Sequence, residues 1–308
     1  MIGLAVIGHR RNGVRKIFWL SLLIIGVGIV LLSMSYQEPP KTASSTVEPP
    51  LEKEVQYKSY TLESSVVHTL LIPGDSRFLV IPAVSQELSS LESFAQKHQA
   101  LAVINGGFFD PQNQESTSYI VQQGVLVADP RKNERLMDNP KLAPYLEKIL
   151  DRTEFRRYRC GSTVVYDIAL HSEPTPKDCQ LVDALGGGPG LLPEITSVAE
   201  GFLDVDNGLV IRDSVNSRQP NARSAIGITR DRNILLVMVA QQPLSQTSGM
   251  SLTALADFMK TLGVEKAMNL DGGSSSSFYY NGKTFYGKVD DQGNPLTRPV
   301  LSVLLVKD

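Results

Sequence analysis

Histidine and cysteine are scarce in this chain, and their scarcity limits the chemistry open to it. The sequence contains four histidines and two cysteines among 308 residues. The histidines are scattered without paired spacing, and the cysteines do not have the spacing of a zinc site. A Gly-x-Ser-x-Gly frame is also lacking. We therefore expect neither a histidine-based metal centre nor a serine hydrolase, and we predict no bound cofactor.

An excess of charge of one sign is absent as well. The chain has 30 lysines and arginines against 32 aspartates and glutamates, and its formal net charge is −2. Its basic runs are short, and the densest, Arg152 to Arg159, is typical of a solvated face. Because nucleic-acid binding needs a concentrated positive surface, we predict no nucleic-acid partner.

One long hydrophobic run is present, and it lies near the N-terminus. A basic tail, residues 1–16, precedes Ile17 to Met34, which contains no charged residue. As a helix this run spans about 27 Å, close to the hydrocarbon thickness of a bilayer. Because cationic flanks stay in the cytoplasm, we interpret residues 17–34 as a single-pass transmembrane signal anchor with the N-terminus in the cytoplasm. A cleaved signal peptide is the alternative, although its apolar stretch usually has only about 7 to 15 residues.

The residues after this run divide into a linker and one domain. Residues 35–54 are rich in proline and polar residues and poor in large apolar ones, which predicts a semi-extended linker. Residues 55–308, about 250 in number, suffice for one large core. We expect this domain to lie in the periplasm or outside the cell. Thiols oxidise there, so we predict a disulfide between Cys160 and Cys179.

The apolar pattern of the domain predicts many strands and few helices. We expect helices near residues 88–95, 140–151 and 251–263, the last with Ser251 as its N-cap. Asn281-Gly282 predicts a hairpin turn, and its flanking aromatic residues either line a sugar site or belong to the core. Several strands are continuous apolar runs, so we predict an α+β single domain with a large mixed β-sheet and a few flanking helices, preceded by the transmembrane helix. The predicted strands are 55–62, 65–72, 78–84, 100–104, 163–170, 222–229, 234–240 and 300–306.

Four motifs combine glycine with polar residues next to apolar elements. They are Asn105 to Phe109, Gly187 to Leu191, Arg223 to Gly227 and the stretch from Gly249 to Ser276. Each alone is a weak signal, since glycine-rich loops are common and Asp-Gly-Gly can be a simple turn. Together and in this order they resemble the phosphodiester glycosidase family, and the resemblance covers about residues 100–306. It implies cleavage of a glycosyl phosphodiester, and therefore a glycan or sugar-phosphate substrate.

A phosphodiester carries negative charge, so such a site needs a fixed cation and N–H donors. Arg223 offers a planar fork suited to two phosphate oxygens. Gly186 to Gly188 offer a backbone nest for the same anion. The alternatives are an ordinary ion pair for Arg223 and a tight turn for the glycines.

Glycosidic cleavage usually requires two carboxyl groups. Asp271 is the first catalytic candidate because it follows an apolar strand, where desolvation raises a carboxyl pKa; the alternative is an Asx-turn. Asp110 is the second candidate, and a divalent cation near Asp271 is left open. Asn105 and Asn269 either bind sugar hydroxyls or satisfy loop backbone. The predicted substrate-binding residues are Asn105, Gly106, Gly107, Gly187, Gly188, Arg223, Asn269, Gly272, Gly273 and Ser275.

Two positions depart from the pattern of the family. Ala254 stands where members commonly carry a glutamate on a helix, and Ser274 replaces a third glycine after the aspartate. Asp257, one turn further along, is interpreted as an exposed helix residue rather than a substitute. We predict an exported hydrolase that cleaves a glycosyl phosphodiester in an envelope or extracellular glycan. The alternative, favoured by Ala254, is a catalytically silent module that binds a glycan or phosphoglycan.

Overall fold

A computed structural model describes residues 53–243 and 248–308 of the chain. They fall within one compact unit, Pro50–Asp308. The predicted basic tail, anchor and most of the linker lie outside the described residues. Within the described ranges, no helix combines the length and the hydrophobicity needed to cross a membrane.

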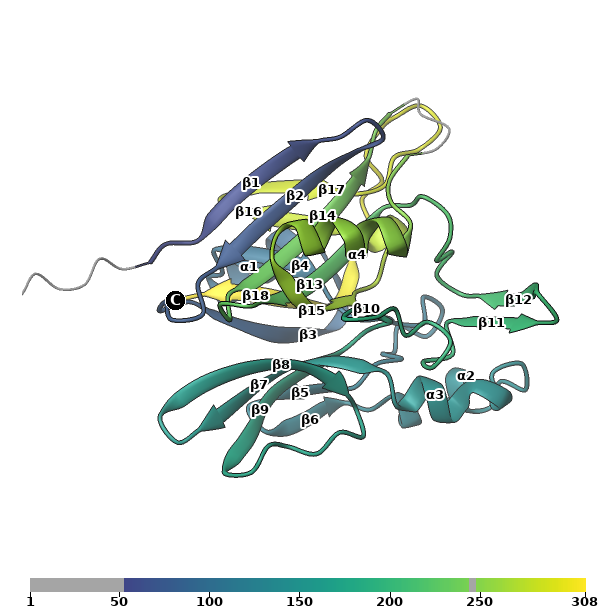
Figure 1. Ribbon diagram of the computed structural model, residues 1–308, viewed down its shortest axis with the longest axis horizontal. Helices are drawn as coiled ribbons and strands as arrows, with labels where there is room; N and C mark the ends of the chain where they lie inside the picture. The colour runs from purple at the N-terminus through teal and green to yellow at the C-terminus, as the bar shows by residue number, and fades with distance from the viewer. Residues whose placement is uncertain (1–52, 244–247) are drawn as a thin grey trace, which may run out of the picture. The chain divides into compact units, whose positions relative to one another are not determined.

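One sheet has six strands, and its strand pairs are all antiparallel (Figure 1). Its long middle strands are apolar and almost entirely buried, because other layers cover both faces. The strands, in spatial order, are β1 (Gln56–Thr61), β2 (Ser65–Ile72), β14 (Ile234–Gln241), β13 (Arg223–Thr229), β15 (Val264–Asn269) and β10 (Gly190–Leu192).

Two further sheets have five strands each, and a two-stranded hairpin, β11 (Leu203–Asp206) with β12 (Leu209–Asp213), stands apart from them. The order in the first is β17 (Lys283–Tyr286), β16 (Ser277–Tyr280), β4 (Ala102–Asn105), β18 (Val300–Lys307) and β3 (Leu79–Ser89). The order in the second is β6 (Val125–Ala128), β5 (Ile120–Gln122), β9 (Cys179–Gly186), β7 (Thr153–Cys160) and β8 (Thr163–Leu170).

The single domain with mostly strands and few helices agrees with the predicted class, but the large mixed sheet is wrong. Every strand pair in the described part of the chain is antiparallel. Continuous apolar runs suggested parallel strands because those are usually buried on both faces. Here an antiparallel sheet reaches the same burial: on β14, Leu236 and Met238 pack into one core cluster and Leu235 and Val237 into another.

The helices are few and short. The longest is α4 (Leu252–Thr261), and Ser251 is its N-cap as predicted, since Ser251 Oγ accepts the N–H of Ala254 at 3.1 Å. The buried face of α4 packs beside β15. The predicted helix at residues 140–151 is split into two short turns. The remaining helices are α1 (Leu91–His98), α2 (Glu134–Met137) and α3 (Leu146–Leu150), with the 3-10 turns η1 (Pro130–Lys132), η2 (Ala143–Tyr145) and η3 (Gly273–Ser275).

The predicted disulfide is confirmed. Cys160 and Cys179 are bonded, and they face each other in the β7–β9 pairing. The bridge therefore joins the end of one strand to the start of its neighbour.

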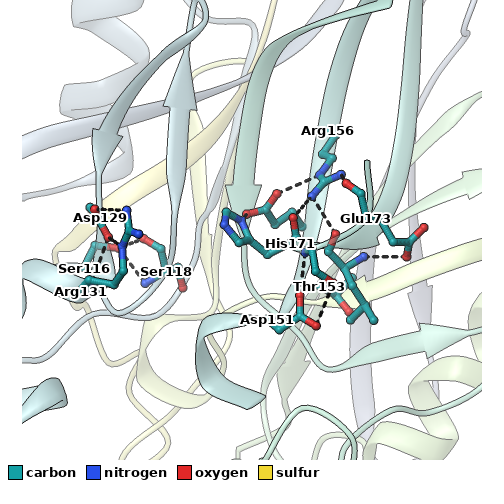
Figure 2. A network of polar contacts seen from close by, with 12 residues as sticks. Ser116, Ser118, Asp129, Arg131, Asp151, Thr153, Arg156, His171 and Glu173 are labelled. Atoms are coloured by element: carbon teal, nitrogen blue, oxygen red, sulfur yellow. Dashed lines mark hydrogen bonds and ion pairs between the residues drawn. The ribbon is translucent and has the colours of Figure 1, made fainter. Parts of the chain in front are cut away.

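The solvated face predicted for residues 152–159 is wrong, because this run forms β7. Arg156 is 3% exposed and donates to Glu154 at 2.9 Å. It also donates to the backbone carbonyls of His171 and Glu173, both at 2.8 Å (Figure 2). A buried cation with this many acceptors is satisfied, so Arg156 fastens β7 to the turn after β8.

Candidate functional site

Asp271 lies in the loop between β15 and β16, against the end of β4. Its backbone N–H donates to Gly106 O at 3.0 Å, and its carbonyl accepts from Asn105 Nδ2 at 2.7 Å. The strand register places this loop, because Ala225 of β13 pairs with Asn269, the last residue of β15. Two bonds to β4 therefore fix the backbone of Asp271, while its side chain is left for other contacts.

Burial raises the pKa of Asp271 from 3.8 to about 6. The Ser275 side chain, the positive charge of Arg298 and the Gly272 N–H oppose this rise. Ser275 Oγ is nevertheless buried without a hydrogen-bond partner of normal geometry among the described residues, so its hold on Asp271 is weak. A carboxyl group with this pKa exchanges its proton near neutral pH, which suits acid–base chemistry.

Arg298 is a cation at this site that the sequence did not point to. It lies just before β18, its Nη1 donates to Ser274 Oγ at 3.0 Å, and its guanidinium carbon is 5.1 Å from the centre of the Phe109 ring. No other hydrogen bond of its guanidinium is found within the described ranges. Arg298 stands outside the four glycine-containing motifs, so only its contact across the fold reveals it.

Asn105 supports the loop instead of facing a ligand. Its side chain is fully buried, and its Oδ1 accepts from Ser224 Oγ at 2.6 Å and from Ser277 N at 3.2 Å. With Nδ2 bonded to Asp271 O, the amide ties β4, β13, β16 and the Asp271 loop together. The sugar contact predicted for Asn105 does not agree with this arrangement, and its alternative role, satisfying loop backbone, does.

Asn269 serves partly the same purpose. Its Nδ2 donates to Gly188 O at 3.1 Å and to Leu270 O at 2.6 Å. Its Oδ1 is buried and has no hydrogen-bond partner among the described residues, as is true of Ser276 Oγ. Unsatisfied polar atoms in a buried segment are costly, so they mark the stretch from Asn269 to Ser276 as unusual.

The predicted backbone nest at Gly186 to Gly188 is already filled. The three N–H groups donate to the carbonyls of Tyr119 at 2.8 Å, Thr153 at 2.9 Å and Asn269 at 2.8 Å. The glycines allow close approach: a Cβ on Gly107 would lie 2.2 Å from Gly186 O, and one on Gly187 would lie 2.6 Å from Met268 Cε. The glycine motifs thus bring the loops together, and no anion nest is left.

The remaining predicted glycines and Arg223 surround the same loop. Gly106 N donates to Ser302 O at 2.8 Å and Gly273 N to Ala222 O at 2.9 Å, while a Cβ on Gly272 would lie 4.0 Å from Arg223 Nη1.

Arg223 itself is 1% exposed, and its guanidinium is occupied. It leaves no pair of N–H groups for two phosphate oxygens, so the predicted phosphate contact is not supported. Its acceptors are the backbone carbonyls of Val215 and Asn216 at 2.7 Å and of Gln219 and Met250 at 2.9 Å.

Asp110 is turned toward its own loop. Its Oδ1 accepts from Gln112 N at 2.8 Å and its Oδ2 from Arg135 Nε at 2.7 Å. Slight burial favours a higher pKa of Asp110, but the bonds from Gln112 and Arg135 prevail and lower it. These contacts do not support the predicted role of Asp110 as a second catalytic carboxyl.

Glu200 is a buried carboxylate that the sequence did not point to, and it binds the end of the Gly186–Gly190 segment. It accepts from Thr153 N at 2.8 Å, Thr153 Oγ1 at 2.7 Å and Gly190 N at 2.8 Å, and also from Thr196 Oγ1. Glu200 follows a stretch of mixed polar and apolar residues, 193–199, that carries no motif, and only the fold brings these donors to it.

Ala254 occupies the third position of α4, three residues after the N-cap Ser251. A glutamate there completes a capping box by reaching back to the N-cap N–H. Ala254 is exposed, and Asp257 is an exposed partner of Lys260 at 3.5 Å, as its interpretation predicted. A glutamate at this position would therefore be placed to cap α4.

Among the residues that the structure describes, no three His, Cys, Asp or Glu side chains gather in a way that could hold one ion. The divalent cation near Asp271 stays a prediction.

The chain is similar to one protein family and to several solved structures. A family model described as phosphodiester glycosidase matches residues 98–307. The comparison with curated proteins gives no match. The catalytic domain of zebrafish N-acetylglucosamine-1-phosphodiester alpha-N-acetylglucosaminidase, auto-inhibited by its pro-peptide, is similar with 21% identity and a TM-score of 0.59, over 85% of each chain.

Two bacterial structures share the fold. A putative exported protein from Burkholderia pseudomallei has 16% identity and a TM-score of 0.57, over 79% of this chain and 74% of that one. A hypothetical protein from Synechocystis has 17% identity and a TM-score of 0.54, over 82% of this chain. The match spans 61% of the length of the Synechocystis chain.

Proposed function

This chain belongs to the phosphodiester glycosidase family, and from that premise we propose that it hydrolyses a glycosyl phosphodiester in an envelope or extracellular glycan. In this proposal Asp271 is the catalytic carboxyl group and Arg298 faces the phosphate. The observation that supports it best is the raised pKa of Asp271, about 6, in a loop whose backbone is fixed at Gly106 and Asn105.

Hydrolysis of a glycosyl phosphodiester depends more on a carboxylate near the anomeric carbon than on an acid that protonates the leaving oxygen. Cleavage of the glycosidic C–O bond releases a phosphate ester whose oxygen needs little protonation, because phosphates are weakly basic with a second pKa of about 6. Asp271 therefore acts in its ionised form: it accepts the proton of the attacking water, whose oxygen bonds to the anomeric carbon. The raised pKa makes this carboxylate a better base than an ordinary aspartate.

Arg298 supplies the charge for the departing phosphate. Its guanidinium has one hydrogen bond, to Ser274, within the described ranges, so its remaining N–H groups can meet phosphate oxygens. Arg223, the cation expected from the sequence, is committed to four backbone carbonyls instead.

The rival function, a silent glycan-binding module, rested on Ala254. Because a glutamate at this position of α4 would serve as a capping group, its absence removes helix stability and not a reacting group. This reading favours an enzyme.

We also propose that the domain is exported and held at the membrane by residues 17–34. The support is the basic tail before an uncharged apolar run, together with the Cys160–Cys179 disulfide, which is typical of oxidising compartments. The substrate is then a glycan near the envelope.

The test uses the full-length chain with a UDP-sugar and with a diester of a sugar 1-phosphate. Asp271→Asn is expected to lower kcat/KM by at least about 100-fold. In the unmodified protein, kcat/KM should rise about tenfold per pH unit below pH 6 and level off above it, because only the ionised carboxyl acts.

Asp257→Asn is the matched control, since Asp257 is exposed on α4, and it should leave kcat/KM unchanged. Turnover that survives in Asp271→Asn would exclude the catalytic assignment. Saturable binding of the substrate without turnover would favour the silent module.

A further inference from the structure

Two further arginines line a cavity beside Phe108, and Arg298 is not among its lining residues. The cavity has a volume of about 190 Å³. Apolar side chains and two arginines dominate its lining, with Thr117 and Ser214 adding hydroxyl groups. The main lining residues are Phe108, Leu136, Leu142, Arg152, Phe202 and Arg212.

The guanidinium of Arg152 is fixed in position in this cavity, but few groups compensate its positive charge. Its guanidinium carbon is 3.7 Å from the centre of the Phe202 ring, and Nε donates to Glu200 O at 3.3 Å. Neither Nη group has a hydrogen-bond partner among the described residues. Packing against an aromatic ring thus fixes the group and leaves two donor nitrogens for something else.

Arg212, on β12, faces the same cavity. Its Nε donates to Gly201 O at 2.8 Å, and its guanidinium carbon is 4.9 Å from the centre of the Tyr145 ring. The Nη groups again have no hydrogen-bond partner within the described ranges. Two arginines, each anchored through Nε and an aromatic ring, therefore present free N–H groups to one space.

The carboxylates near the cavity are engaged elsewhere. Glu200 accepts four hydrogen bonds from Thr153, Gly190 and Thr196. Asp204 accepts from Tyr145 OH at 2.7 Å, and Asp213 accepts from Ser217 N at 2.8 Å. Burial lowers the pKa of Arg152 to about 9. The negative charge of Glu200 opposes this shift and the positive charge of Arg212 adds to it, so the two arginines repel each other.

We propose that the cavity between Arg152 and Arg212 binds a phosphate group. Two cations close together in a partly buried space are stabilised by an anion between them, and guanidinium N–H pairs match tetrahedral phosphate oxygens. The cavity is smaller than the pockets for whole small ligands, which usually have about 300 Å³ or more. One anionic group therefore fits inside, and any attached sugar stays outside.

The phosphate site lies next to the Asp271 loop without being part of it. Gly106, whose carbonyl accepts the Asp271 N–H, is two residues before Phe108 in the chain. The assignment does not require Asp271 to be catalytic. The phosphate belongs either to free inorganic phosphate or to a phosphorylated sugar.

The experiment measures binding by calorimetry on the full-length protein, with inorganic phosphate and with a hexose 1-phosphate as separate probes. We expect saturable binding with Kd of about 1 mM or tighter, weakened at least about tenfold by Arg212→Gln and by Arg152→Gln. Ser214→Glu brings a carboxylate to the cavity and should weaken binding as much without touching the packing of Arg152. Ser214→Glu keeps the test decisive if Arg152→Gln fails to fold.

Two controls locate the site. Arg230→Gln removes an arginine whose side chain is 83% exposed and should leave Kd unchanged. Arg298→Gln removes the cation proposed to face the substrate phosphate, so binding that persists in this variant and is weakened by Arg212→Gln belongs to the cavity, and a failure here is separate from a failure at Asp271. Tighter binding of the hexose phosphate identifies a sugar-linked group, and equal or weaker binding identifies free phosphate; either ranking supports the site.

The proposal is overturned by any of three results: no saturable binding of either probe, an unchanged Kd in both Arg212→Gln and Ser214→Glu, or binding that Arg298→Gln abolishes while the cavity variants keep it.

Discussion

Two acidic residues, Glu200 and Asp271, lie close to the contact between the Gly186–Gly190 segment and Asn269. Glu200 accepts hydrogen bonds from four donors and shows no unpaired oxygen. Asp271 has its backbone fixed, but burial raises the pKa of its carboxyl group to about 6 because few groups compensate the charge. The difference indicates which carboxylate is scaffold and which is available for chemistry.

The arginines divide in the same way. Arg223 donates to four backbone carbonyls, and Arg156 donates to a carboxylate and several carbonyls. Arg152 and Arg298 keep N–H groups without hydrogen-bond partners in the described part of the chain. Satisfied polar groups stabilise a fold, whereas incompletely satisfied ones are retained where a ligand completes them.

The largest effect should come from removing the satisfied carboxylate. Glu200→Ala leaves four donors without their acceptor and removes a negative charge near Arg152, which should lower the free energy of unfolding by about 3–5 kcal/mol. Urea unfolding measures it. Glu194→Ala, at an exposed position, should change the free energy of unfolding by less than about 0.5 kcal/mol. A small effect at Glu200 would contradict its role as scaffold.

Removing the Asp271 carboxylate, whose pKa is raised, should have the opposite sign. The folded state raises the pKa of Asp271 from 3.8 to about 6, so ionisation of this group destabilises the fold as pH rises from about 4 to about 6. Asp271→Asn avoids that cost, and at pH 7 it should raise the free energy of unfolding by roughly 2 kcal/mol relative to the unmodified chain.

The pH dependence of this difference makes the test specific. Near pH 4 the two proteins should have about the same stability, because the Asp271 carboxyl is then protonated in the folded state. Urea unfolding at pH 4 and pH 7 measures both values. A variant that is less stable than the unmodified chain at pH 7 would show that Asp271 is another satisfied carboxylate, like Glu200.

The smallest expected effect concerns α4. Ala254→Glu should complete a capping box with Ser251 and place a negative charge in the first turn, raising the free energy of unfolding by about 0.5 kcal/mol. It should leave kcat/KM unchanged, because the position serves the helix end. Ala254→Gln is the matched neutral control. A large gain in kcat/KM with Ala254→Glu and not with Ala254→Gln would instead restore a catalytic role for the glutamate.

The strands that the sequence predicted are present, but several others were missed and the pairing of strands into sheets was predicted wrongly. All eight strands predicted from apolar runs are present, as is the hairpin at Asn281-Gly282, because both depend on local pattern. Strands β7 and β12 lacked such a pattern: β7 is rich in arginine, and β12 exposes Leu209 and Ile211. Whether two strands pair parallel or antiparallel depends on contacts between residues that are distant in the chain. The local periodicity of apolar residues does not predict these contacts.

Among the site residues, the chemical type of a side chain gave a wrong prediction where its hydrogen-bond partner comes from a distant part of the chain. Arg223 and Asn105 have the groups that bind phosphate and sugar, yet both are buried and bonded to backbone or to neighbouring side chains. Arg298 and Arg152 looked like ordinary basic residues, and only the surrounding Phe109 and Phe202 rings set them apart.

The sequence by itself determined the family, the order of the glycine motifs, the disulfide pair and Asp271 as the first carboxyl candidate. These follow from residue identity and spacing, which need no knowledge of what lies across the fold. Only the tertiary structure decided which polar groups are satisfied, because a hydrogen bond such as Asn105 Nδ2 to Asp271 O joins residues far apart in the chain. That distinction turned Arg223 and Glu200 into scaffold and left Asp271, Arg298 and Arg152 as the groups to test.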